Sequence, residues 1–210
     1  MERRELLKMI AALTGGVVVG GEVFLTGCNT SDEKAPFAAF TNNDIALLDE
    51  IAETILPRTK SPGAKDAAVG QFMTVMVNDC YTPKDQQVFH EGIKRLNEAS
   101  KKMYGEEFIK LTTQKRHDFL VTLDKEAKEH QKQRTAFNKD QDQTQKDEIP
   151  KGGFKKREEM NAHYFTMMKQ LTLLGFFTSK QGATQALRFV AVPGRFDSCI
   201  PYKKGDRAWA

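Results

Sequence analysis

Residues 41–57 read TNNDIALLDEIAETILP, and this stretch decides the fold class. Thr41, followed three residues later by Asp44, is the pattern of a helix start in which side chains bond back to free backbone N–H groups. The apolar residues that follow recur at helical spacing: Ile45, Leu48, Ile51, Ala52 and Ile55. Pro57 cannot continue a helix. The sequence therefore predicts an amphipathic helix that starts at Thr41 and ends before Pro57.

Five more segments carry helical spacing. Their expected bounds, in chain order, are 69–80, 82–105, 112–126, 157–174 and 179–189. Pro83 suits the first turn of the second of these, and Gly105 ends it. The segment 157–174 is the most apolar, and we expect Gly175 to end it. All of these segments predict helices with one face in a common core.

Two stretches lack this spacing. Residues 130–156 are rich in Lys, Gln and Asp and predict a polar loop. Residues 190–210 contain Pro193-Gly194 and Pro201 and predict an extended tail. No alternating strand pattern is present. The predicted fold is all-α: a compact bundle of about five to six helices over residues 41–210, with an extended C-terminal tail.

The first 28 residues have the order of a signal peptide: basic, then apolar, then small residues at a cleavage site. Arg3-Arg4 resemble a twin-arginine export signal, which carries proteins that have already folded. Glycine dilutes the apolar stretch 9–25, as that route tolerates. An ordinary secretory signal with two chance arginines is the alternative. Either signal predicts export.

Leu25-Thr26-Gly27-Cys28 resembles a bacterial lipobox. Cleavage before Cys28 and acylation of this residue would anchor the chain in a membrane. The alternative, an uncleaved membrane helix, needs a span of about 20 residues, and 9–25 is short and glycine-rich for one. Residues 29–40 then form a polar tether. The expected location is the periplasmic side of a membrane, with the inner or outer membrane left open.

Basic and acidic residues are mixed along the sequence, so no strong electrostatic field of one sign is expected. The chain has 210 residues and a net charge of +4, with 32 basic residues largely interleaved with 28 acidic ones. The dense basic run Lys151–Arg157 fits a solvated loop better than a phosphate-binding patch. An intermixed surface of this kind argues against nucleic acid as a partner.

Few residues of the sequence point to a chemical site. The histidines show no metal-site spacing to another His, Cys or carboxylate: His90, His117, His130 and His163. There is no phosphate loop or nucleophile elbow, and no Cys-x-x-Cys-His for covalent haem. The carboxylates Asp49, Glu50 and Glu53 are interpreted as a solvated helix face. We expect no catalytic, cofactor or metal site in this chain.

Two cysteines remain once Cys28 is assigned to lipid. In an oxidising compartment, Cys80 and Cys199 predict a disulfide that would join the tail to the second helix. Such a bond closes a long loop and could contribute up to about 4–5 kcal/mol. Two separate thiols, one of them buried, are the alternative.

Two blocks carry a resemblance to a known family. The first is Ile55–Thr59 with Ser61–Ala64 and Val69–Cys80. The second is Leu171–Ser179, followed by Pro193–Phe196, Cys199–Tyr202 and Ala208-Trp209. Together they resemble gluconate 2-dehydrogenase subunit 3, over most of the chain from about Phe40 and most weakly across 130–156.

The resemblance implies an accessory role. It implies a large catalytic partner of the glucose-methanol-choline oxidoreductase type that holds FAD, and a small subunit whose twin-arginine signal exports both. It also implies a c-type cytochrome as electron acceptor in relatives, although the lipobox leaves any cytochrome anchor in doubt. On this interpretation Arg195, Phe196, Tyr202 and Trp209 are candidate interface residues. They could equally pack the tail onto its own helices.

Two rival hypotheses stay open. One is an autonomous periplasmic helical lipoprotein that binds a small ligand or another protein. The other is an enzyme using His163 and Tyr164. The substrate of the complex cannot be inferred, since specificity would belong to the large subunit.

Overall fold

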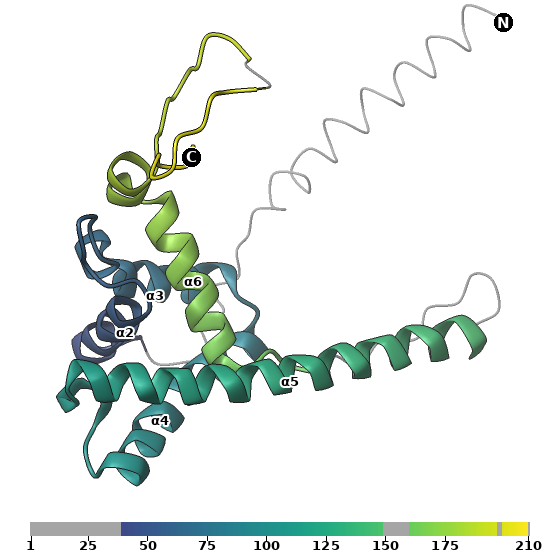
Figure 1. Ribbon diagram of the computed structural model, residues 1–210. Helices are drawn as coiled ribbons and strands as arrows, with labels where there is room; N and C mark the ends of the chain where they lie inside the picture. The colour runs from purple at the N-terminus through teal and green to yellow at the C-terminus, as the bar shows by residue number, and fades with distance from the viewer. Residues whose placement is uncertain (1–38, 149–159, 197–198, 210) are drawn as a thin grey trace, which may run out of the picture. The chain divides into compact units, whose positions relative to one another are not determined.

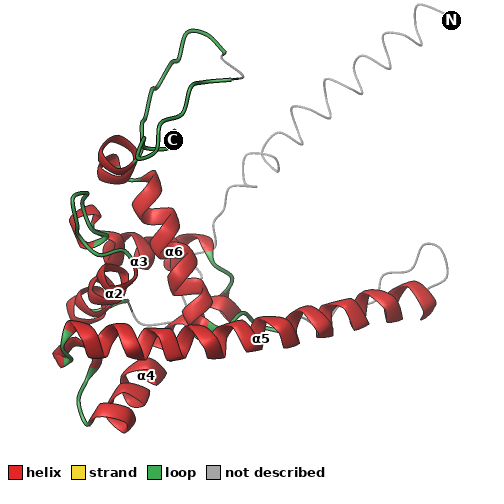
Figure 2. Cartoon of the chain, in the orientation of Figure 1, coloured by secondary structure: helices red, strands yellow, loops and turns green. Residues whose placement is uncertain are grey.

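The computed structural model describes residues 39–148, 160–196 and 199–209. Their main elements are α-helices, shown in Figures 1 and 2: α2 (Asn42–Ile55), α3 (Val69–Cys80), α4 (Pro83–Tyr104), α5 (Thr113–Glu148) and α6 (Tyr164–Thr178). Two short 3-10 helices lie between them, η2 (Lys65–Ala67) and η3 (Phe108–Lys110), and the π-helix η4 (Gly182–Ala186) follows α6. The described residues form no strand, which confirms the all-α prediction. The predicted signal and lipobox fall before residue 39 and lie outside these residues. Of the predicted tether 29–40, only residues 39 and 40 are described, and Phe40 packs on Phe89 and His90.

The predicted helix ends are found at α2 and α4. Thr41 and Asp44 form a capping box: Asp44 N donates to Thr41 Oγ1 at 3.2 Å, and Thr41 N donates to Asp44 Oδ2 at 2.9 Å. Thr82 caps α4 in a similar way ahead of Pro83. Gly105 ends that helix at φ 77°, a left-handed conformation that suits glycine. These local signals were sufficient because each depends on neighbouring residues alone.

Helix α6 packs against all four of the other α-helices. The core around it consists of side chains from every helix, the largest fully buried being Leu48, Ile51, Met73, Phe89, Leu96, Phe108, Phe165 and Met168. Phe119, Leu120 and Leu123 of α5 are also buried. Burial of this apolar surface is the main stabilising contribution to the fold.

Two glycines let α6 approach its neighbours. A Cβ on Gly92 of α4 would lie 2.4 Å from Tyr164 Cβ, and one on Gly175 would lie 2.6 Å from Phe72 Cδ1. The prediction that Gly175 ends this helix is therefore wrong. Gly175 sits inside the helix, where α3 needs the space, and α6 continues to Thr178.

The predicted loop at 130–156 is wrong over its first part, because α5 continues to Glu148. Residues 113–148 contain no Gly or Pro, and Lys, Gln, Glu and Arg are good helix formers. Arg134 Nε also donates to Met160 O at 2.8 Å, which ties this half of α5 to the chain just before α6. Residues 149–156 lie outside the described residues.

The last two predicted helices also differ from the structure. Residues 160–163 are not helical, and α6 starts at Tyr164 instead of Arg157. The predicted helix 179–189 is present in shorter form: residues 180–186 are helical and end in η4 at Ala186. A Cβ on Gly182 would lie 1.9 Å from Phe176 O, so this short helix packs directly on the end of α6. No helix among the described residues is long and apolar enough to span a membrane.

Candidate partner-binding surface

The C-terminal segment forms a projecting arm whose two ends are held together. We call residues 189–196 and 199–206 the arm and residues Arg188, Arg207 and Trp209 the clasp. Arg188 N donates to Ala208 O at 2.8 Å, and the Arg188 guanidinium lies 4.6 Å from the centre of the Trp209 ring. Arg207 Nη1 donates to the carbonyls of Thr184 and Gln185 at 3.1 and 2.8 Å. The clasp thus fixes both ends of the arm to η4.

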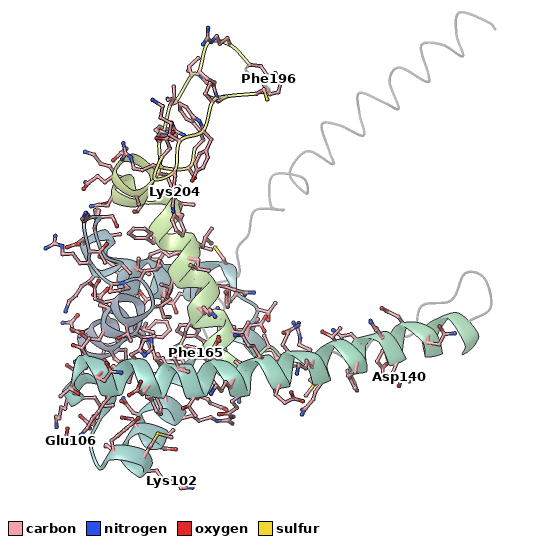
Figure 3. The ribbon with its side chains drawn as sticks, in the orientation of Figure 1. Lys102, Glu106, Asp140, Phe165, Phe196 and Lys204 are labelled. Atoms are coloured by element: carbon pink, nitrogen blue, oxygen red, sulfur yellow. The ribbon has the colours of Figure 1, made fainter. Side chains whose placement is uncertain are left out.

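The arm itself is exposed. Phe196 is 90% exposed and Tyr202 is 73% exposed, and Arg195 is also exposed. Figure 3 shows Phe196 at the end of the arm far from α6. Trp209, at 50% exposure, belongs to the clasp. Of the four predicted interface residues, three lie on the arm and Trp209 lies in the clasp, where its ring contacts Arg188. Their role as an interface stays a prediction.

A second apolar surface lies on α6. Leu173, Leu174 and Phe177 occupy one face of the helix and are 40, 45 and 38% exposed. Helix α6 is apolar around nearly its whole circumference in this half, which is the pattern of a helix covered on all sides. The sequence could therefore have predicted that one face of this helix has no partner within the chain.

The C-terminal segment that contains the arm and the clasp has a net positive charge. Residues 188–209 hold five basic and two acidic side chains, a net charge of +3, whereas the whole chain has +4. The basic positions are Arg188, Arg195, Lys203, Lys204 and Arg207. No long basic run marks this segment in the sequence, since Lys203-Lys204 is its only adjacent pair of basic residues.

The two cysteines do not form the predicted disulfide. Cys80, at the end of α3, and Cys199, in the arm, are both free and exposed. The clasp holds the tail through the bonds from Arg207 to Thr184 O and Gln185 O of η4 and through the contact of Trp209 with Arg188. The attachment of the tail therefore rests on the clasp.

His163 and His130 come together beside a cavity of about 500 Å³ that lies between α4, α5 and the start of α6. Their ring centres are 5.5 Å apart, and His163 Nε2 lies 3.7 Å from Glu126 Oε1. His163 Nδ1 accepts from Phe165 N at 3.3 Å and so caps α6. Burial raises the pKa of Tyr164 to about 12, so this phenol stays protonated at neutral pH. The His163 imidazole uses Nδ1 to cap α6 and lies next to a protonated phenol, so it is a poor general base.

The other two histidines are separate from this pair. His90 stacks on Phe40 with ring centres 4.1 Å apart, and His117 is exposed next to Asp118 on α5. Within the residues that the structure describes, no three His, Cys, Asp or Glu side chains gather as metal ligands would.

The carboxylates of α2 are not the solvated face that we predicted. Asp49 Oδ1 accepts from Gly70 N at 2.8 Å, and Glu53 accepts from the backbone N–H groups of Arg58 and Lys65 at 2.8 and 2.9 Å. Glu50 pairs with Lys65 at 2.5 Å and with Arg116. These side chains hold the turn after α2 and the start of α3. Their role is structural, and helical periodicity could not reveal partners that lie on other elements.

The described surface thus belongs to a helical domain that presents apolar side chains and a basic arm. Comparison with known families identifies the family of this domain. The chain belongs to the gluconate 2-dehydrogenase subunit 3 family, whose sequence profile matches residues 42–194. The comparison with curated proteins found no match, and neither did the comparison with solved structures.

Proposed function

We propose that this chain is the non-catalytic small subunit of an FAD-dependent sugar or sugar-acid dehydrogenase. In this role it exports, matures and tethers the catalytic subunit, which is of the glucose-methanol-choline oxidoreductase type. The observation that carries the proposal is the family match over residues 42–194, since the family is named for subunit 3 of gluconate 2-dehydrogenase. FAD belongs to the partner on this account, and this chain binds no cofactor.

The exposed apolar side chains support an accessory role. In the isolated chain, Phe196 and Tyr202 of the arm and Leu173 and Phe177 of α6 are exposed to solvent, where they contribute little to the stability of the fold. Exposed apolar surface of this kind marks an interaction site in many proteins. Aromatic side chains supply much of the binding energy at protein interfaces. The arm and the α6 face are therefore the proposed contacts with the catalytic subunit.

The leader supplies the export and anchoring parts of the proposal. A twin-arginine signal at Arg3-Arg4 carries folded proteins, so the partner could load FAD in the cytoplasm and cross the membrane with this chain. Acylation at Cys28 would then hold the complex on the periplasmic side of a membrane. A c-type cytochrome is the proposed electron acceptor.

The export role has a direct test. The double variant Arg3→Lys/Arg4→Lys should leave both this chain and the flavoprotein in the cytoplasm, and Lys8→Arg in the same leader is the matched control. The measurement is flavoprotein content and dehydrogenase activity in periplasmic and membrane fractions. Undisturbed export of the flavoprotein in the double variant would contradict the proposal.

A second candidate function rests on the cavity beside His163. His130 Nδ1 is buried there and, among the described residues, has no hydrogen-bond partner. An autonomous lipoprotein could use such a site for a small polar ligand. Purification would separate the two candidates, because this one predicts a stable monomer without a flavoprotein partner.

A further inference from the structure

The clasp shapes the arm before any partner binds. Arg188 is fixed to Ala208 through the backbone and to Trp209 through its guanidinium, while Arg207 is bonded to the carbonyls of η4. Gly182 seats η4 on the end of α6. Twenty-one positions apart in sequence, Arg188 and Trp209 therefore meet at the base of one projecting segment. Holding both ends lowers the entropy that the segment would lose on binding.

The side chains of the arm combine two chemistries. Phe196, Ile200 and Tyr202 are exposed apolar groups that could fill pockets in a partner. Lys203 and Lys204 are exposed beside them, and the segment 188–209 carries a net charge of +3. The remaining 188 residues account for a net charge of +1. The arm itself holds Arg195, Lys203 and Lys204 against Asp206, a net charge of +2, and its complement is an acidic surface with apolar pockets.

We propose that the clasped arm docks into an acidic groove with aromatic-accepting pockets on the catalytic subunit, and that its lysines steer the encounter. The proposal rests on the function proposed above and specifies the chemistry of one contact. The clasp residues Arg188, Arg207 and Trp209 are positioning residues for this contact.

A protein groove fits the arm better than a lipid surface does. The described arm residues form no helix and no strand, so their backbone N–H and C=O groups have no regular internal ladder. Groups of this kind are costly in hydrocarbon, where nothing can pair with them. A protein groove can supply both hydrogen bonds and apolar pockets. A second copy of the chain is also disfavoured, because two basic arms repel each other.

The test compares arm variants of the full-length chain in binding to the flavoprotein that co-purifies with the wild type. Lys203→Glu/Lys204→Glu should slow association about tenfold at low ionic strength, and the difference should shrink as salt is added. Phe196→Ala/Tyr202→Ala should speed dissociation about tenfold or more, with little salt dependence. Trp209→Ala should weaken binding although every arm aromatic is still present.

Matched controls and folding checks separate the loss of the arm contact from a general effect of charge and from unfolding. Lys102→Glu/Lys139→Glu changes the charge by the same amount on α4 and α5 and should leave both rates unchanged. Thermal unfolding should be unaltered in the arm variants, since the mutated side chains are exposed. If the wild type forms the complex and the arm variants bind equally well, the docking proposal is wrong while the accessory function stands.

Two further outcomes are decisive. If the wild-type chain forms no complex with any flavoprotein, the proposed function itself fails. If the arm variants lose binding to vesicles of anionic phospholipid but keep wild-type rates with the flavoprotein, the arm contacts the membrane and the docking proposal is overturned.

Discussion

His163 caps helix α6 with its own ring: Nδ1 accepts the backbone N–H of Phe165 at 3.3 Å. This arrangement needs a neutral ring with its proton on Nε2, which faces Glu126. Protonation would place a hydrogen on Nδ1 and a positive charge at the N-terminus of a helix, where the dipole disfavours it. The start of α6, and with it the contact to α4 at Gly92, therefore depends on the charge of one imidazole.

The first prediction concerns pH. Burial lowers the pKa of His163 below its ordinary value, and the charges of His130 and Arg95 act in the same direction, against Glu126. A folded-state pKa below the unfolded value means that the unfolded chain binds the proton first as the pH falls. Stability should therefore decrease as the pH drops below about 6.5.

The variant His163→Asn isolates this effect. Asparagine is a good N-cap, and its side chain does not titrate. Between about pH 7.5 and about pH 5.5, the range over which histidines titrate, the variant should therefore lose less stability than the wild type. Burial also lowers the pKa of His90, so part of the decrease should persist. Thermal unfolding at both pH values measures the difference. Equal losses in variant and wild type would contradict the assignment.

The second prediction concerns Glu50, which joins α2 to the loop at Lys65 and to α5 at Arg116. Although partial burial favours the acid form, the hydrogen bond from Lys65 and the charge of Arg116 lower the pKa of Glu50 below its ordinary value. Its contribution to stability is therefore present above the unfolded-state pKa and is lost as the pH falls through the folded-state value. Glu50→Gln should destabilise the protein by about 1–3 kcal/mol at neutral pH.

Glu98→Gln on the exposed side of α4 is the control for this substitution and should change stability by less than about 0.5 kcal/mol. Denaturant unfolding at neutral pH compares the two. Similar small values for both variants would show that the Glu50 contacts contribute little.

The third prediction concerns the crossing of α4 and α6. Gly92→Ala would place a methyl group 2.4 Å from Tyr164 Cβ, inside contact distance. Overpacking of this kind costs about 1–3 kcal/mol. Lys94→Ala, two residues further along the same helix, adds no atom to the interface and should be close to neutral. A stable Gly92→Ala variant would mean that α6 can shift away without loss.

The fourth prediction concerns the thiols. Cys80 and Cys199 are both free and exposed, so an alkylating reagent should label both in the folded, unreduced protein. Mass analysis before and after denaturation gives the count at each position. Labelling that requires a reducing agent would contradict the structure.

The sequence predicted the parts of the fold that depend on neighbouring residues. The Thr41–Asp44 capping box, the Thr82-Pro83 start of α4 and its end at Gly105 follow from local hydrogen bonds and backbone conformation. Gly175 was misinterpreted because its reason lies on another helix, where Phe72 needs the space. The polar half of α5 was missed because its apolar content is low while its helix propensity is high.

The candidate surface was predicted in part. Phe196 and Tyr202 were proposed as contacts from the family resemblance, and both are exposed in the structure. The clasp between Arg188 and Trp209 could not be predicted, since it brings together two residues with no sequence pattern in common. The roles of Asp49 and Glu53 were missed for the same reason, as their partners are backbone N–H groups of a loop and of α3.

The most direct test of the accessory role is to purify the full-length chain from the membranes of its own cells in mild detergent. Flavin absorbance and the identity of the bound protein are then measured. We predict a stoichiometric complex with a flavoprotein of the glucose-methanol-choline type. After the subunits are separated, all of the flavin should remain with that protein, and this chain should show no dehydrogenase activity. Recovery of the chain as a monomer, or flavin and sugar oxidation that stay with the isolated chain, would contradict the account.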